Sequence, residues 1–226
     1  MIEALLPAGV IAVEAFDDRP GEPAFPGEED LIANAVPGRR AEFVTARRCA
    51  REALAALGYP AAAIRAGSRR EPLWPSGVAG SITHCAGYRA AAVAHAADIP
   101  SLGIDAEPHA PLPAGVERQV IVAAEATMLA RLARTHPGTH WDRLLFSAKE
   151  SIYKTWFPLT GRWLGFEEAT LSIDPDAQTF SARITADASP LAGFDGRYRV
   201  GDGLIVTTVW QPPAGSVRTA PATAGG

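Results

Sequence analysis

The chain has 226 residues, 47% hydrophobic and 20% charged, with a net charge of −4. This length allows one large domain or two small ones, and the acidic balance argues against a general nucleic-acid binder, which would be basic. Two cysteines give no disulfide framework, the first 15 residues lack a signal peptide's basic region, and no run reaches transmembrane length, so we expect a cytoplasmic protein with no membrane segment.

The first hundred residues predict helices followed by short strands. Residues 17–30, rich in Pro, Gly and acid, predict a surface loop, and a short helix is expected over 29–36. A longer helix over 38–57 carries an apolar stripe that includes Phe43 and Leu54, and Gly58 is its expected stop. A loop over 67–77 then leads to strands over 80–83 and 89–95.

The rest of the chain predicts a strand over 101–105, a helix over 117–134 and a helix over 142–156. Four further strands are expected near 168–174, 179–185, 197–201 and 203–210. The tail over 212–226 is rich in Pro, Ala, Gly and Thr and predicts disorder. This order of elements indicates an α+β fold, and no sequence repeat is visible.

An acidic motif, GIDAE, occupies residues 103–107. Side chains two apart on a strand point to the same face, so Asp105 and Glu107 project together. They could be solvated residues at a strand end, but two converging acids after an apolar stretch favour a metal site. Together with Glu150 they would offer three carboxylates, which suit a hard cation such as Mg²⁺.

A second motif, FSAKESIYK, occupies residues 146–154. Lys154 follows Glu150 by four residues and shares its side of the helix. The alternative for Glu150 is a capping box with Ser147 as the N-cap, and the alternative for Lys149 and Lys154 is that of ordinary exposed helix charges. A carboxylate–metal–lysine cluster would suit phosphoryl-type transfer.

Basic residues gather upstream of these motifs. Five arginines fall within thirteen residues, namely Arg39, Arg40, Arg47, Arg48 and Arg51. They could form a solvated helix face with neighbouring glutamates, but bidentate donors also suit a phosphomonoester. His84 ends an apolar strand and could be a satisfied core histidine. Activation of Cys85 by His84 is excluded, because adjacent strand residues face opposite ways.

Four blocks, at residues 38–51, 80–89, 103–107 and 146–154, resemble those of the Sfp-type 4′-phosphopantetheinyl transferases in order and spacing. The sequence WFPLTGRWLGFEEA after the last block is similar to the actinobacterial and enterobactin-type branch. The resemblance implies two similar α+β halves, residues 1–100 and 101–211, related by a pseudo-twofold axis with coenzyme A between them. It implies transfer of phosphopantetheine from coenzyme A to a serine of an apo acyl or peptidyl carrier protein.

The resemblance also implies residue roles. The metal, Mg²⁺ with Mn²⁺ as an alternative, would be held by Asp105, Ala106 through its backbone or a water, Glu107 and Glu150. Glu150 would be the general base, and Lys154 and His84 would stabilise the leaving group. The implied contacts to coenzyme A are Arg39 or Arg40, Arg47, Gly67, Ser68, Arg69, Thr83, His84, Asp105, Lys149 and Lys154. Ala66 stands where relatives can have lysine.

Two other functions remain alternatives at this point. A coenzyme A diphosphate hydrolase would use the same metal chemistry with water as nucleophile, although the Nudix-type signature is absent. A non-catalytic carrier-binding homologue would keep the fold alone, although the three acids are intact. We expect a monomer that binds no nucleic acid, and the carrier could belong to fatty-acid, polyketide or nonribosomal peptide synthesis.

Overall fold

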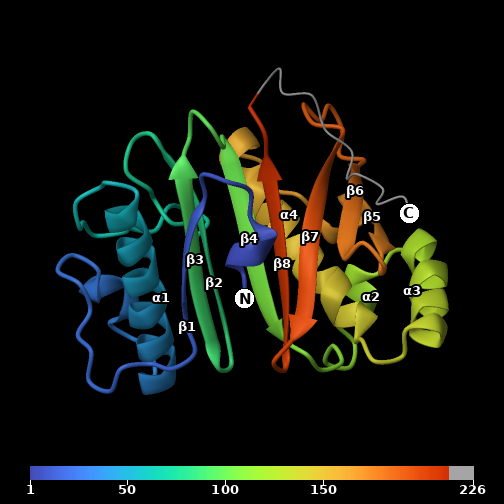
Figure 1. Ribbon diagram of the computed structural model, residues 1–226, viewed down its shortest axis with the longest axis horizontal. Helices are drawn as coiled ribbons and strands as arrows, with labels where there is room; N and C mark the ends of the chain where they lie inside the picture. Colours follow the sequence, from blue (N-terminus) through green and yellow to red (C-terminus); the bar gives the residue numbers. More distant parts are fainter. Residues whose placement is uncertain (214–226) are drawn as a thin grey trace.

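The structure, a computed structural model, describes residues 1–213. It contains two antiparallel sheets placed side by side, each with a long helix against one face (Figure 1). The α+β prediction is therefore confirmed. The expected disorder of the tail concerns residues that lie, from 214 onward, outside the described part of the chain.

The first sheet is built from β1 (Ile11–Ala15), β2 (Val78–Cys85) and β3 (Tyr88–His95) in the order β1-β3-β2. Its helix, α1 (Pro37–Ala56), packs mainly on β3 and β1. Proline at the first helical position suits α1 because its missing N–H has no partner there in any helix. Short 3₁₀ turns lie at Glu3–Leu5 (η1) and Glu29–Ile32 (η2).

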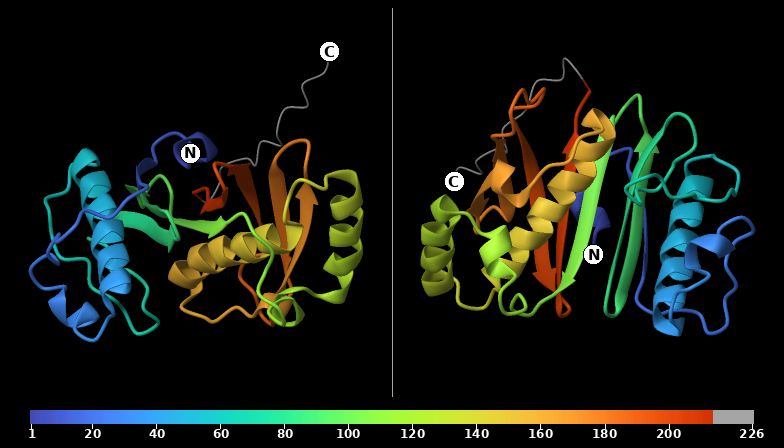
Figure 2. Two further views of the ribbon diagram at one scale, coloured as in Figure 1. Left: turned by 90° about the horizontal axis from the view of Figure 1, so that it is seen from below. Right: turned by 180° about the vertical axis from the view of Figure 1, so that it is seen from behind.

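The second sheet has the order β4-β8-β7-β6-β5. Its strands are β4 (Ser101–Pro108), β5 (Ala169–Asp174), β6 (Thr179–Ile184), β7 (Gly193–Gly201) and β8 (Leu204–Gln211). The helix α4 (Trp141–Thr160) lies across β4 and β8, as the view from behind in Figure 2 shows. The helix α3 (Ala123–Thr135) packs on the edge strand β5, and the short α2 (Glu117–Val120) contacts α4 and the turn η3 (Phe166–Glu168).

The two halves share one topology. In the first, a strand, a helix and a hairpin follow one another, and the first strand pairs with the last: β1, α1, β2, β3. The second repeats this order and pairing with β4, α4, β7 and β8. It differs by the inserted α2, α3 and β5–β6 hairpin. The repeat is therefore structural, although no sequence repeat reveals it.

The halves meet where β2 lies beside β4. No ladder of backbone bonds joins these two strands in the described chain. Instead, backbone amides of β4 donate hydrogen bonds to hydroxyl groups of β2. The Ile104 amide donates to Ser81 Oγ at 3.1 Å, and the Ala106 amide donates to Thr83 Oγ1 at 3.0 Å. Side chains thus supply the partners that a neighbouring strand would supply in a continuous sheet.

Three sequence expectations differ from the structure. The helix expected over 117–134 is two helices, because the backbone is extended at Ile121 and Val122 and Glu125 caps a new start by accepting the Val122 amide. The short helix expected over 29–36 is only the 3₁₀ turn η2, and β1 was not expected at all. Within residues 1–213, no helix combines the length and apolarity that crossing a bilayer requires.

Candidate functional site

Gly103 brings α4 into contact with β4. A Cβ atom at this position would lie 2.0 Å from the Ser151 carbonyl oxygen and 2.6 Å from Thr155 Oγ1. Any side chain would therefore push the helix away from the strand. The glycine of the GIDAE motif allows this close approach, and it places the acids of β4 beside the charged residues of α4.

Asp105 is buried, with 5% of its surface exposed. Its Oδ1 accepts a hydrogen bond from Lys154 Nζ at 2.8 Å and one from Thr83 Oγ1 at 3.4 Å. Its Oδ2 is also buried and has no partner among the described residues. A buried carboxylate oxygen without a donor is costly, so this atom is suited to accept a hydrogen bond from a ligand or to bind a cation.

Glu107 points to the same side as Asp105 and is paired with an arginine that the motifs do not include. Arg143 Nη1 lies 2.8 Å from Glu107 Oε2. Burial raises the pKa of Glu107 and Asp105 adds to the rise, while Arg143 opposes it. The two acids of the motif thus share one side of β4, as the strand periodicity predicts, and repel each other.

Glu150 lies in the middle of α4, so the capping-box alternative is wrong. Ser147 sits in the second turn of the helix, where its Oγ contacts Thr207 Oγ1 at 3.0 Å instead of capping an amide. Burial raises the pKa of Glu150; Lys154 opposes this, while Asp105 and Glu107 increase it. A carboxylate with a raised pKa close to other acids suits either cation binding or proton transfer.

The three carboxylates fit a hard divalent cation in their chemistry. They supply oxygen donors, one of them without a partner, and their mutual repulsion would be relieved by a positive charge. Their present arrangement is not a ready coordination shell: in residues 1–213, no three His, Cys, Asp or Glu side chains are grouped to hold a metal. Ion pairs with Lys154 and Arg143 neutralise Asp105 and Glu107 instead.

A pocket of about 730 Å³ opens next to these acids, between α1, the loop before β2, and α4. The charged residues lining it are Arg39, Arg47, Arg69, Arg70, Glu71, His84, Glu150 and Lys154. Most are basic, and they come from both halves of the molecule. Such a wall suits a polyanionic ligand.

Arg39 and His84 meet in the pocket. Arg39 Nη1 lies 2.6 Å from His84 Nε2 and 3.2 Å from Glu42 Oε2. Because a guanidinium only donates, the ring nitrogen facing it must accept. Burial lowers the pKa of His84 to about 4, and Arg39 contributes to that shift. His84 is therefore neutral at pH 7, in a position where a phosphate would favour its charged form.

Arg47 lies in the pocket wall and is largely buried. Its guanidinium carbon lies 3.6 Å from the centre of the Phe43 ring, and Nε donates to the Ile64 carbonyl at 3.1 Å. In the described chain, neither of its terminal nitrogens has an acceptor. Burial lowers the pKa of Arg47 to about 10, so it remains protonated at neutral pH and can donate two hydrogen bonds to a ligand.

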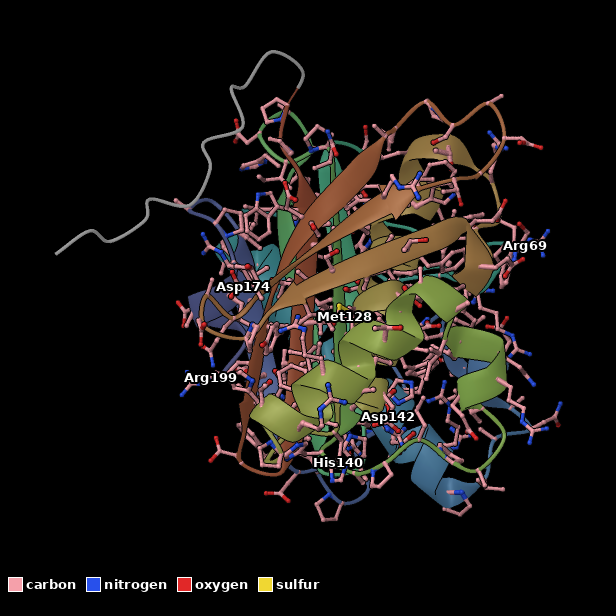
Figure 3. All side chains as sticks on the ribbon, turned by 90° about the vertical axis from the view of Figure 1, so that its right-hand side faces the viewer. Arg69, Met128, His140, Asp142, Asp174 and Arg199 are labelled. Carbon is pink, nitrogen blue, oxygen red and sulfur yellow. The ribbon has the colours of Figure 1, made fainter. Side chains whose placement is uncertain are left out.

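The loop before β2 forms the opposite side of the pocket. An isolated bridge between Ala66 and Pro72 closes it, and Arg70 adopts φ = 68° at its tip. Arg69 and Arg70 both line the pocket, and Figure 3 shows Arg69 at the outer margin of the molecule, far from the start of α4. Gly67 and Ser68 belong to the same loop but not to the lining residues.

Several predicted residues are not brought to the pocket. Of the pair left open, Arg39 faces it, whereas Arg40 donates to the Ile32 carbonyl. Thr83 is buried against Asp105, and the Ala106 side chain packs in the core. Arg40 and Thr83 are not among the lining residues, and their contacts with coenzyme A stay a prediction.

Lys149 lies away from the pocket. Its ammonium group is buried on the other side of α4, where Nζ lies 2.8 Å from Glu125 Oε2 and from the carbonyls of Val120 and Phe166. Three acceptors satisfy its three donors. Lys149 therefore fastens α4 to α2, α3 and η3, and the side chain that faces the pocket from this part of the motif is Glu150.

The aromatic residues after the second motif divide between core and pocket. Trp156 is fully buried. Tyr153 and Phe157 line the pocket with ring centres 5.9 Å apart, and Trp163 packs on Tyr153 at 5.0 Å while 62% of its own surface is exposed. The pocket thus has an apolar side along α4, next to its charged side.

Sequence reasoning missed Arg70 and Arg143. Arg70 follows Arg69 directly, so the basic dipeptide was a usable signal for the loop. Arg143 precedes Glu150 by seven residues, two helical turns, which places it on the same face of α4. That spacing could have predicted the shared face of Arg143 and Glu150. It could not predict the partner of Arg143, because Glu107 is 36 residues away in the sequence.

Comparison with known proteins identifies a family for this chain. Residues 27–94 match the 4′-phosphopantetheinyl transferase N-terminal domain, and residues 101–204 match the 4′-phosphopantetheinyl transferase superfamily. The chain is 52% identical over 225 residues to the 4′-phosphopantetheinyl transferase Svp of Streptomyces mobaraensis, covering 96% of this chain and 92% of Svp.

Two further relatives match with similar coverage. Npt of Nocardia iowensis is 50% identical over 222 residues, which cover 92% of this chain and 99% of Npt. PptT of Mycobacterium tuberculosis is 46% identical over 223 residues, which cover 92% of this chain and 97% of PptT. Both carry the name 4′-phosphopantetheinyl transferase. The chain belongs to the 4′-phosphopantetheinyl transferase family.

Proposed function

We propose that this protein transfers the 4′-phosphopantetheine group from coenzyme A to a serine hydroxyl of an apo carrier protein, giving holo-carrier and 3′,5′-ADP. One observation carries the proposal: arginines of the first half line one pocket together with Glu150 and Lys154 of the second half, and Lys154 is paired with the buried Asp105. Coenzyme A has a 3′-phosphate and a diphosphate, and it needs both kinds of partner. Family membership, with about half of all positions identical to Svp, supports the same activity.

The arginines would bind the nucleotide end of coenzyme A. The two terminal nitrogens of Arg47 have no acceptor among the described residues. Arg39 lies about two helical turns before it on α1 and lines the same pocket. We assign the 3′-phosphate to these two residues, with Arg69 and Arg70 flanking the nucleotide from the loop. Lys154, held beside Asp105 at 2.8 Å, would face the diphosphate. His84 would become charged as phosphate oxygens replace Arg39 as its neighbour.

Glu150 would accept the serine proton. It lines the pocket, and burial together with the charges of Asp105 and Glu107 raises its pKa. A general base works best with a pKa nearer to the working pH. The hydroxyl oxygen then bonds to the β-phosphorus of coenzyme A as the bond to the diphosphate bridging oxygen breaks. Lys154 would stabilise the charge that develops on the 3′,5′-ADP leaving group.

Asp105, Glu107 and Glu150 would hold Mg²⁺, with Mn²⁺ as a substitute and the backbone of Ala106 as an additional donor. A divalent cation in this position supplies charge neutralisation for the diphosphate. The unpartnered Asp105 Oδ2 is the observation that favours it. The ion pairs of Asp105 and Glu107 would have to be shared with the cation, since both carboxylates are engaged by basic side chains.

The two alternatives predict different products. A hydrolase would consume coenzyme A without modifying a carrier, and a non-catalytic binder would do neither. Intact-mass analysis after incubation with apo-carrier, coenzyme A and Mg²⁺ separates them: the proposal requires the carrier to gain one phosphopantetheine group. Consumption of coenzyme A with an unmodified carrier would favour hydrolysis. Repeating the assay with fatty-acid, polyketide and nonribosomal carriers identifies the substrate.

We further propose that the protein acts as a monomer in the cytoplasm, with residues 1–100 and 101–211 as its two halves. The free state of Cys49 and Cys85 supports a reducing environment. The net charge of −4 supports the absence of nucleic acid as a partner. Size-exclusion chromatography with light scattering tests the monomer, and fractionation of cells tests the location.

A further inference from the structure

Basic residues at both ends of one face of α4 hold the two acids of β4. Lys154, near the end of the helix, pairs with Asp105 at 2.8 Å, and Arg143, in its first turn, pairs with Glu107 at 2.8 Å. Glu150 lies between these two cations along the helix. The strand and helix therefore run in opposite directions, and each acid of the motif has its own cationic partner.

Arg143 makes more contacts than an ion pair requires. Its Nε donates to the Ala110 carbonyl at 3.1 Å and its Nη2 to the Pro111 carbonyl at 2.5 Å, while Nη1 contacts Glu107. All three nitrogens of the guanidinium are used, and the side chain is 13% exposed. The planar fork is thus fixed on the loop that follows β4, and its orientation does not depend on Glu107 alone.

The neighbouring residue strengthens this attachment. Asp142 Oδ2 accepts the backbone amide of Leu112 at 2.8 Å, so two successive residues of α4 fasten the loop after β4. Figure 3 shows Asp142 beside His140 at the start of α4, beneath α2 and α3. The anchor of Arg143 is therefore part of a rigid connection between the strand end and the helix start.

Glu107 is held through one oxygen only. Arg143 contacts Oε2, and within residues 1–213 no hydrogen bond is made to Oε1. We infer that Arg143 is a positioning residue for the reaction: it fixes the Glu107 carboxylate so that the other oxygen is available to a divalent cation shared with Asp105 and Glu150. This rests on the proposed function and adds a residue to it, since neither acidic motif contains Arg143.

A competing effect has the opposite sign. A guanidinium next to Glu107 also repels a divalent cation, so its removal could strengthen metal binding. Carboxylates that bind metals are generally held by hydrogen bonds from surrounding groups, and loss of such a partner weakens metal affinity by about 10- to 100-fold. The three-point anchoring of Arg143 favours the orienting effect, because a mere counter-charge would not need two loop carbonyls.

The test measures metal binding without turnover. Mn²⁺ is titrated into the full chain and followed by electron paramagnetic resonance for the unaltered protein, Arg143→Gln and Arg143→Lys. Arg48→Gln is the matched control, because Arg48 also pairs with carboxylates, at Glu22 and Glu52, but lies on α1 away from the pocket lining. Thermal unfolding of each variant reports the loss of loop attachment separately.

We expect Arg143→Gln to weaken Mn²⁺ binding about tenfold or more and to raise the Mg²⁺ concentration for half-maximal transfer, with the KM for coenzyme A at saturating Mg²⁺ little changed. Arg143→Lys keeps the positive charge but loses the planar guanidinium. Its Mn²⁺ affinity should therefore lie between those of the unaltered protein and of Arg143→Gln. If Arg143→Gln does not fold, Arg143→Lys still tests the positioning role. If Arg143 acted only through its charge, the Lys variant would bind Mn²⁺ as tightly as the unaltered protein.

The outcomes separate the two claims. Equal or tighter Mn²⁺ binding by both Arg143 variants would overturn the positioning role while leaving the metal site in place. No Mn²⁺ binding by the unaltered protein would overturn both this inference and the metal part of the proposed function. Transfer without any divalent cation would do the same, while phosphopantetheine transfer itself would stand.

Discussion

The first strands of the two halves, β1 and β4, each carry an acidic residue, but the two acids have different surroundings. Glu14 on β1 accepts hydrogen bonds from the amino group of Met1, the amide of Ile2 and the hydroxyl of Tyr88. Burial would raise the pKa of Glu14, but these donors together lower it. Asp105 on β4 is more deeply buried than Glu14 and leaves Oδ2 without a donor among the described residues.

This difference teaches how one topology serves two purposes. In the first half, the acid is satisfied locally, and the helix α1 contributes cations to the pocket. In the second half, the acid is left partly unsatisfied, and α4 contributes a carboxylate and a lysine. A shared fold therefore does not imply a shared use of equivalent strands, and we expect β4, which carries the unsatisfied oxygen, to be the strand that contacts a ligand.

The largest difference in activity should appear when Asp105 and Glu14 are each replaced by a neutral residue. Asp105→Ala should reduce kcat by at least about 10³-fold, more than the 10- to 100-fold typical of losing an outer partner of a metal site, with thermal stability nearly kept. Glu14→Gln should lower stability by about 1–3 kcal/mol with kcat per folded molecule maintained. Steady-state kinetics and thermal unfolding measure both. Comparable kcat losses in Asp105→Ala and Glu14→Gln would show that the two acids do not differ in function.

A second prediction compares glutamates on the two long helices. Glu150→Gln should lower kcat by at least about 10²-fold, as expected for a lost general base, while coenzyme A still binds because the cationic wall is intact. Glu52→Gln on α1, which breaks only the ion pair with Arg48, should leave kcat unchanged. Binding is measured by calorimetry and kcat with saturating carrier. A Glu150→Gln variant with normal kcat would leave the general base unassigned.

A third prediction separates the cations of the two halves. Arg47→Ala should raise the KM for coenzyme A by an amount equivalent to about 1.5–3 kcal/mol, but should affect 3′-dephospho-coenzyme A little, because the lost partner is the 3′-phosphate. Lys154→Ala should affect both substrates equally, since both contain the diphosphate. KM values for the two substrates with each variant decide this. An equal loss for both substrates in Arg47→Ala would remove the 3′-phosphate assignment.

The smallest predicted effect concerns pH. The pKa of His84 is about 4 in the folded chain and about 6.5 when unfolded, so between these values the unfolded chain binds more protons. Stability should therefore fall as the pH is lowered from about 6.5 to 4. His84→Gln should flatten this part of the stability curve, measured by urea unfolding. Bound 3′,5′-ADP should raise the His84 pKa in nuclear magnetic resonance titrations; an ordinary pKa without ligand would contradict the burial effect.

Short-range patterns predicted the elements that carry the site. The alternation of the GIDAE strand placed Asp105 and Glu107 on one side, and the spacing of four residues placed Glu150 and Lys154 on one face of a helix. Both follow from the backbone geometry of a single element. Gly58, with φ = 92°, follows the end of α1 as predicted, because left-handed backbone after a helix favours glycine.

The remaining features depend on contacts between distant segments. Lys149 and Glu150 are adjacent in the sequence, and only the packing of α2, α3 and η3 on one side of α4 decides that Lys149 is buried with Glu125. The Arg143–Glu107 pair likewise needs the relative placement of β4 and α4. The break at Ile121 could not be read from helical periodicity, because apolar residues continue on both sides of it.

The junction between β2 and β4 has a mechanical consequence. Within residues 1–213, the hydrogen bonds between these two strands all involve side chains: the Ile104 and Ala106 amides donate to Ser81 and Thr83, and the Thr83 hydroxyl donates to Asp105. Backbone ladders instead connect the strands inside each half. A ligand bound by Arg39 and Arg47 of the first half and by Lys154 of the second would connect the two halves across the junction of β2 and β4. We therefore expect the two halves to unfold as separate units more readily in the empty protein, and to melt as one cooperative body when the nucleotide is bound.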